Sequence, residues 1–163
     1  MPVDAERYRS LAASFPTGVA IVTARDADGT PKGLTTQSFV GLSVEPPLML
    51  VTVARTSRTL SALLAARAFV VNFMKAGAED VAARFATKDE DKFAGIRWEP
   101  SANARGAAIL RDAAHAYAEC VLKDAIEAGD HWILVGQVEG GEVLDGEPLL
   151  YFRRRYAAWP PVP

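Results

Sequence analysis

The chain has 163 residues, is half apolar and carries a formal charge of −2. This size suits one domain with a sizeable core, so we expect residues 1–163 to form a single domain. The charge balance supplies no broad positive surface for a phosphate backbone, and we therefore expect no nucleic acid partner. Because Cys120 is the only cysteine, the chain alone can form neither a disulfide nor a multi-cysteine metal site.

The sequence gives no sign of export or of membrane insertion. Residues 1–7 lack the basic flank and apolar core of a signal peptide, and no apolar run reaches the ~18 residues of a spanning helix. A single cysteine also fits a reducing compartment. We expect a cytoplasmic protein with no membrane partner.

The first part of the chain predicts a short helix followed by three strands. Apolar side chains at helical spacing indicate an amphipathic helix over residues 4–14. The β-branched residues 19–23 indicate a first strand, and an Asp-Gly turn joins it to a second strand over residues 32–38. Two consecutive prolines then separate this region from a third strand over residues 48–53.

The remaining chain predicts two helices and four strands. Ser57 at an N-cap position, followed by leucines three and four residues apart, indicates a helix over residues 57–64. A buried strand is expected over residues 69–73 and a second helix over residues 78–86. Three further strands are expected over residues 115–126, 131–142 and 149–152. A Gly-Asp turn links the first two of these as a hairpin.

Apolar strands linked by hairpins, with helices inserted between some of them, favour an antiparallel barrel that is closed or partly closed. Regular alternation of strand and helix is missing, and so is a Gly-x-Gly-x-x-Gly turn between a strand and a helix. The sequence therefore predicts a mainly β fold and no dinucleotide-binding Rossmann unit.

His131, one of two histidines, stands at the mouth of the strand expected over residues 131–142. A titratable ring in that position is a candidate for redox or acid–base chemistry. A histidine next to Asp130 can equally cap the turn and have its tautomer fixed by the carboxylate. The residues alone leave both roles open.

Two further segments have the composition of a ligand site. Residues 35–39 are short polar side chains followed by an aromatic, which suits a flat heterocycle with a polar edge but also a half-exposed strand. Residues 53–59 combine hydroxyls and arginines with the start of a helix, where free N–H groups favour a phosphate. An ordinary N-cap with solvated arginines has the same pattern.

Three segments, in this order, carry a resemblance to a known family. They are Phe15-Pro16-Thr17-Gly18-Val19, then Gly33-Leu34-Thr35-Thr36-Gln37-Ser38-Phe39 continuing through Leu42-Ser43-Val44-Glu45-Pro46-Pro47-Leu48, and finally Gly129-Asp130-His131. The chain resembles the flavin reductase family with the FMN-binding split-barrel fold, the small partner of two-component flavin monooxygenases. The resemblance spans residues 8–156 and implies an antiparallel split β-barrel of Greek-key type with a few short helices.

The resemblance also implies the ligands and the site. FMN or FAD would accept a hydride from NADH or NADPH, with no metal needed. The ring edge would lie against residues 36–39, where family members often have Ala followed by Ser or Asn in place of Thr36 and Gln37. The phosphate would lie against residues 57–59, and His131 would orient the nicotinamide or stabilise charge on the reduced flavin. The flavin-binding residues implied are Thr17, Thr36, Gln37, Ser38, Phe39, Ser57, Arg58, Thr59, Lys92 and His131, of which His131 is also the catalytic residue.

Three other residues receive structural interpretations. Phe15 is expected to pack under the barrel beside a helix-ending proline. Asn72 lies within an apolar strand, where an unpaired amide would cost about 1–3 kcal/mol, so it is expected to have a partner. His115 is expected to be an ordinary strand residue.

The leading hypothesis is an NAD(P)H-dependent flavin reductase whose reduced flavin leaves for a separate monooxygenase. In a second hypothesis FMN stays bound and passes electrons to another acceptor, such as a metal chelate or a corrinoid. In a third, the chain is a non-catalytic flavin- or haem-binding module, with His131 as a possible axial ligand. Family members usually form homodimers with the cleft near the subunit interface, so a homodimer is expected.

Overall fold

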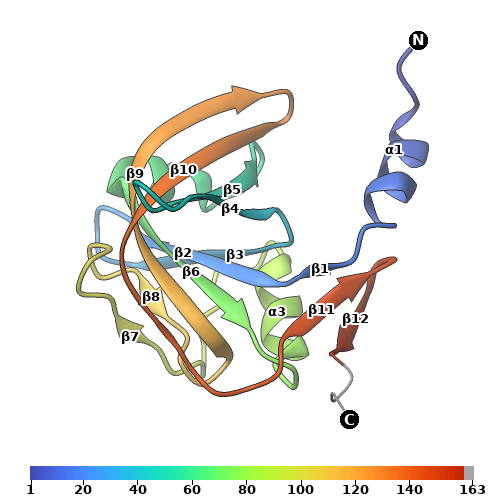
Figure 1. Ribbon diagram of the computed structural model, residues 1–163. Helices are drawn as coiled ribbons and strands as arrows, with labels where there is room; N and C mark the ends of the chain where they lie inside the picture. Colours follow the sequence, from blue (N-terminus) through green and yellow to red (C-terminus); the bar gives the residue numbers. More distant parts are fainter. Residues whose placement is uncertain (160–163) are drawn as a thin grey trace.

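The computed structural model describes residues 1–159 (Figure 1), and β-branched and aromatic residues are concentrated in several of its strands. In chain order the elements are α1 (Ala5–Ala12), β1 (Thr17–Gly18), β2 (Ala20–Arg25), β3 (Pro31–Thr36), β4 (Phe39–Ser43), β5 (Leu48–Ala54), α2 (Leu60–Ala66), β6 (Ala68–Met74), α3 (Glu79–Ala86), β7 (Glu99–Pro100), β8 (Ala108–Ile109), β9 (Ala114–Ala128), β10 (His131–Val143), β11 (Leu149–Phe152) and β12 (Arg155–Ala158). Strands outnumber helices, which confirms the mainly β fold.

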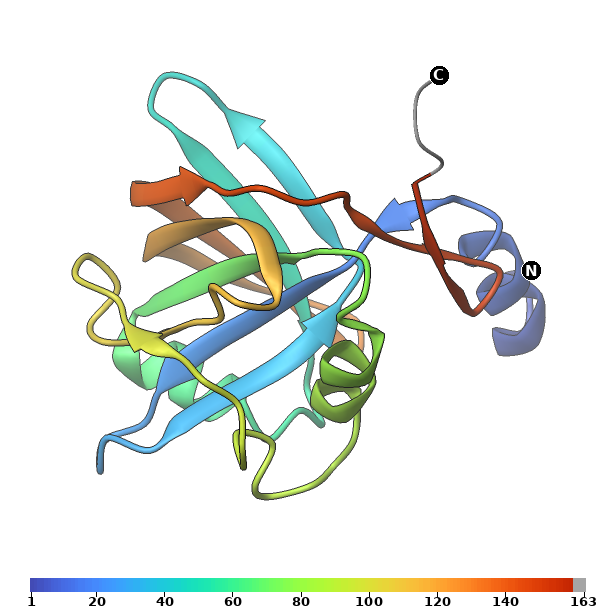
Figure 2. The ribbon, with the colours of Figure 1, turned by 90° about the horizontal axis from the view of Figure 1, so that it is seen from below.

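One large antiparallel sheet forms the body of the molecule, with strand order β3-β2-β6-β9-β10-β5-β4. The sheet is strongly curved (Figures 1 and 2). Its two edge strands, β3 and β4, are consecutive in the chain. This arrangement agrees with the expected partly closed barrel. The two hairpins predicted from Asp-Gly and Gly-Asp turns are β2–β3 and β9–β10.

The apolar core explains why β2 has a continuous run of buried residues instead of an alternating pattern. Ala20 and Val22 pack into the main core cluster inside the barrel, whereas Ile21 faces a second cluster that includes residues of α3. Both faces of this strand are therefore buried, and apolar side chains are favoured on both.

A small sheet carries the N-terminal helix away from the barrel. Strand β11 pairs with both β1 and β12, and the Arg153 N–H donates to the Ala13 carbonyl at 2.9 Å just after α1. Figure 2 shows α1 and the β11–β12 hairpin together, apart from the large sheet. No residue of α1 is buried, and its apolar residues Tyr8 and Leu11 are exposed.

Two local predictions are wrong. Phe15 does not pack under the barrel: the residue is 72% exposed and lines a cleft just beyond the end of α1. Ser57 is not the N-cap of α2, which begins at Leu60 after Thr59. The helix therefore starts later than the predicted residue 57. The Thr59 hydroxyl donates to the Gly33 carbonyl at 3.0 Å and makes no capping hydrogen bond to the helix.

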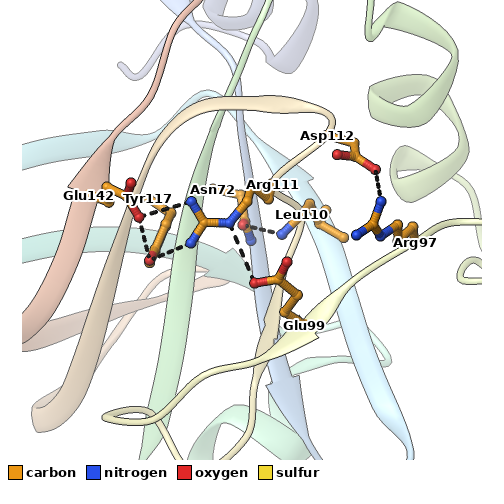
Figure 3. Close-up of polar contacts among 8 residues, drawn as sticks. All are labelled: Asn72, Arg97, Glu99, Leu110, Arg111, Asp112, Tyr117 and Glu142. Carbon is orange, nitrogen blue, oxygen red and sulfur yellow. Dashed lines mark hydrogen bonds and ion pairs between the residues drawn. The ribbon is translucent and has the colours of Figure 1, made fainter.

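Asn72 has the partners that its burial requires. Its amide nitrogen donates to the carbonyls of Ile21 and Ala108, both at 3.2 Å. Its amide oxygen accepts from the Leu110 N–H at 2.8 Å, the contact drawn in Figure 3. The side chain thereby joins β6 to β2 and to the segment around β8. The prediction of a partnered amide is confirmed, and the partners are backbone groups.

We expect Asn72→Ala to lower the free energy of unfolding by about 2–4 kcal/mol, because the buried Leu110 N–H and Ile21 carbonyl each lose a hydrogen bond, and the Ala108 carbonyl keeps only the one from the Thr23 hydroxyl. Denaturant titration measures this change, and flavin affinity measured on the folded variant should stay within about twofold of the original. A loss below about 0.5 kcal/mol would contradict the bridging role.

A charged network on the surface fixes the β7–β8 hairpin against the long strands. Arg111 pairs with Glu99 at 3.4 Å and with Glu142 at 2.9 Å, and it also donates to the Tyr117 hydroxyl at 3.2 Å (Figure 3). These side chains bind one another, and a single exposed ion pair of this kind contributes little to the free energy of unfolding. We interpret the network as structural.

Candidate active site

The principal cleft, called the main cleft below, has a volume of about 650 Å³ and lies where β1, β2, the β3–β4 connection, β5 and β6 meet. Five of the residues predicted for the flavin ring line it together. They are Thr17, Thr36, Gln37, Ser38 and Phe39. The fold thus brings the first and second motif segments to one cleft, although about twenty residues separate them in the chain.

The walls of the main cleft are apolar, with a few polar groups along one edge. Phe39 and Phe73 pack edge to face, with ring centroids 4.8 Å apart, and both side chains line the cleft. On the polar side, the Ser38 N–H donates to the Thr36 hydroxyl oxygen at 3.0 Å, and the Thr17 hydroxyl lies 3.5 Å from the side-chain amide oxygen (Oε1) of Gln37. A flat aromatic ligand with a polar edge fits such a cleft.

His115, expected from the sequence to be an ordinary strand residue, also lines the main cleft. The imidazole lies beside Phe73, with ring centroids 6.4 Å apart. Burial lowers the pKa of His115, and the negative charge of Glu147 opposes that shift. No sequence signal marks this residue, because it approaches the cleft only through the pairing of β9 with β6, in which Phe73 lies opposite Ala116.

A second cleft, of about 310 Å³, collects basic side chains predicted to hold the phosphate. Arg58, Thr59 and Lys92 line it together with Lys32, Asp89 and Glu90. Arg58 donates to the Lys88 carbonyl at 2.9 Å and pairs with Glu90 at 3.5 Å. The cleft therefore offers three basic groups partly balanced by two carboxylates.

Lys92 and Thr59 already have protein partners at this place. The Lys92 ammonium donates to the carbonyls of Gly33 at 3.1 Å and Phe85 at 2.9 Å, and the buried Thr59 hydroxyl donates to the same Gly33 carbonyl. Burial lowers the pKa of Lys92. Both side chains hold β3 against neighbouring segments, so Arg58 is the more accessible basic group.

Ser57 lies in the turn before α2, outside the set of residues that line the second cleft. Its hydroxyl oxygen accepts from the Thr59 N–H at 3.3 Å, and its carbonyl accepts from the Leu60 N–H at 3.2 Å. The structure therefore brings Ser57 next to the cleft through Thr59 but gives it a local bond within the turn.

The two clefts lie at opposite ends of β3. Pro31, Lys32 and Gly33 line the second cleft, and Thr36 lines the main cleft. Gly33 and Thr36 are three positions apart in an extended strand, which places their Cα atoms about 10 Å apart.

His131 lies at the exposed tip of the β9–β10 hairpin and lines neither of these clefts. Its Nδ1 is 2.7 Å from the Asp130 carboxylate, and its side chain is 45% exposed. The hydrogen bond from His131 lowers the pKa of Asp130. The hairpin tip is attached to the segment before α2, since the Arg55 N–H donates to the Asp130 carbonyl at 2.9 Å. The turn-capping contact considered in the sequence analysis is thus present, and the ring points its remaining nitrogen away from Asp130.

Three further observations concern residues 1–159. No group of three His, Cys, Asp or Glu side chains in this range could hold a metal ion. Burial raises the pKa of the Cys120 thiol to about 12, which keeps it protonated and unreactive. None of the described helices is long and apolar enough to cross a membrane.

Comparison with known proteins agrees with this geometry. Residues 12–160 match the flavin reductase like domain family. The chain is 43% identical over 162 residues to a flavin reductase (NADH) of Kitasatospora aureofaciens, covering 97% of this chain and 83% of the relative. It is 39% identical over 160 residues to the reductase subunit HsaB of a flavin-dependent monooxygenase of Rhodococcus jostii, covering 98% of this chain and 80% of the relative.

Among solved structures, an NADH:FAD oxidoreductase of Streptomyces globisporus superimposes with a TM-score of 0.91 at 31% identity, covering 99% of this chain and 96% of that chain. These matches confirm the predictions of the split-barrel fold and of a flavin reductase that uses a pyridine nucleotide. The chain belongs to the flavin reductase family.

Proposed function

We propose that the chain transfers a hydride from NADH or NADPH to FMN or FAD, and that the flavin ring binds in the main cleft. The observation that carries this proposal is the convergence of Thr17 and residues 36–39 on one apolar cleft in a member of the flavin reductase family. When bound, the flavin supplies the hydride-accepting ring, and the chain supplies the aromatic wall, the polar edge and exclusion of water.

The phosphate of the flavin would then lie in the second cleft, near Arg58. The separation of about 10 Å along β3 suits a flat ring and a phosphate joined by a ribityl chain. Arg58, Thr59 and Lys92 stand at this cleft, with Ser57 adjacent. Arg58 is the group most available to the phosphate, because its partners there are exposed.

We expect Arg58→Ala to weaken FMN binding by about tenfold and to leave riboflavin binding unchanged, because riboflavin lacks the phosphate. Fluorescence titration of both ligands measures the difference. Arg55→Ala is the matched control, since Arg55 is also exposed but pairs with Glu127 away from the cleft. Equal losses for FMN and riboflavin would place the phosphate elsewhere.

We propose that the chain works as one domain and as a homodimer, with His131 of one protomer meeting the nicotinamide in the main cleft of its partner. Three observations support this arrangement: His131 lies outside the clefts of its own chain, the hairpin tip that carries it is exposed, and α1 exposes Tyr8 and Leu11. Sedimentation equilibrium provides the test. A monomeric mass at micromolar concentration would overturn the proposal.

The reduced flavin is proposed to leave for a separate monooxygenase in the cytoplasm. The relative named as a monooxygenase reductase subunit supports a partner of this kind. The decisive experiment follows NADH and NADPH oxidation with and without FMN or FAD, and then separates protein from flavin by gel filtration. Stimulation by flavin that elutes separately supports the proposal. Flavin that stays bound favours the alternative with a different acceptor, and flavin binding without oxidation favours a binding module.

A further inference from the structure

His115 is the one residue with a titratable side chain among those that line the main cleft. Every other lining residue is apolar, a glycine, or a neutral polar residue. Among the residues that one chain contributes, a change of pH in the physiological range can therefore alter the charge of this cleft through His115 alone.

The imidazole is built into the apolar wall of the cleft. Phe39, Phe73 and His115 form a row of three rings, with centroid separations of 4.8 Å and 6.4 Å. The backbone of His115 is fixed as well, because its carbonyl accepts from the Leu144 N–H at 2.7 Å. A flat ligand that covers this wall removes the imidazole from water.

Two charged side chains lie near the imidazole from neighbouring elements. Glu147, in the connection between β10 and β11, favours the protonated form. Lys75, directly after β6, also lies next to Gly146: a Cβ at Gly146 would be 3.6 Å from the His115 Cβ and 3.3 Å from the Lys75 Cδ.

We propose that His115 makes ring binding in the main cleft pH-dependent, because the neutral imidazole accepts a covering flavin ring and the imidazolium does not. The inference rests on the proposed binding of the flavin ring in this cleft. Burial in the free protein already disfavours the charged form, and a neutral ring placed over it increases the desolvation cost without supplying a compensating charge.

The direction of the effect follows from proton linkage. Covering His115 lowers its pKa further, so binding releases a proton wherever the free imidazole is protonated. Ring affinity is therefore full above the pKa of His115 in the free protein and falls as the pH decreases through that value. The decrease approaches about tenfold per pH unit until the pKa of the covered imidazole is reached.

Riboflavin is the probe, because it contains the ring but not the phosphate, whose second ionisation near pH 6 would otherwise contribute. We expect riboflavin to bind the original protein about tenfold more weakly at about pH 5 than at about pH 8. His115→Phe keeps an aromatic ring at the wall and His115→Gln keeps a neutral polar group, and both should show affinities that agree within about twofold at the two pH values. His131→Gln is the matched control at the other histidine and should keep the pH dependence.

The chain has two histidines, so their imidazole NMR signals can be assigned from these variants. Riboflavin should lower the pKa of His115. A pH dependence that survives in His115→Phe, or binding that strengthens in acid, would overturn the inference while leaving the ring site in place. Absence of riboflavin binding at about pH 8 in the original protein would instead remove the proposed ring site and this inference with it.

Discussion

Gly18→Phe is expected to weaken flavin binding by about 100-fold, or ~2.7 kcal/mol, without unfolding the protein. Gly18 lines the main cleft, and a Cβ built there meets no atom within 4 Å. The new side chain therefore has open space at the backbone and occupies volume that the flavin ring needs. Fluorescence titration with FMN and riboflavin measures the loss, which should be similar for both because the ring is displaced.

Gly41→Phe is the matched control for this prediction. Gly41 also has open space around a Cβ and also lies in an edge strand, but it does not line the main cleft. FMN affinity of Gly41→Phe should stay within about twofold of the original. If Gly18→Phe binds flavin as tightly as Gly41→Phe does, the ring does not occupy the main cleft.

His131→Ala is expected to lower kcat/KM for NADH by about 10–100-fold and to change FMN affinity by less than about twofold. The reason is that an imidazole orienting the nicotinamide acts on the hydride donor and leaves the flavin wall of the cleft intact. Steady-state oxidation of NADH at saturating FMN measures the first quantity, and flavin titration measures the second. Equal, small changes in kcat/KM for NADH and in FMN affinity would mean that His131 only caps the turn with Asp130.

Mixing subunits tests whether His131 acts across the proposed dimer. His131→Ala and Gly18→Phe damage different parts of the site, so a mixed dimer would combine one intact cleft with one intact His131 from the partner. Random exchange should then restore activity to about one quarter of the original, although each variant alone is impaired. Activity that stays at the average of the two variants would mean that His131 acts within its own chain.

The sequence predicted the long elements well because their signals are local. A Gly-Asp turn between apolar runs was enough to predict the hairpin of β9 and β10, and β-branched residues were enough to predict β2. The missed strands β1, β4, β7, β8 and β12 have two to five residues each. Segments of that length are too short to show a periodicity. Strand β1 is determined by pairing with the distant β11, whereas β4, β7, β8 and β12 pair with strands next to them in the chain.

The site was predictable where residues adjacent in sequence share a cleft, as residues 36–39 do. It was not predictable for His115, whose place depends on the register between β9 and β6. Thr59 illustrates a different reason: its hydroxyl is used by the Gly33 carbonyl on β3, so a residue of N-cap type serves a tertiary contact. Long-range pairing of this kind leaves no trace in local composition.

The most direct test of hydride transfer in the main cleft is anaerobic reduction of FMN by NADH, followed through the loss of flavin absorbance, in the original protein, Gly18→Phe and Gly41→Phe. We expect rapid reduction by the original protein and by Gly41→Phe, and reduction slowed by about 100-fold in Gly18→Phe at limiting flavin. Equal rates in all three proteins would show that the hydride is not transferred in the main cleft.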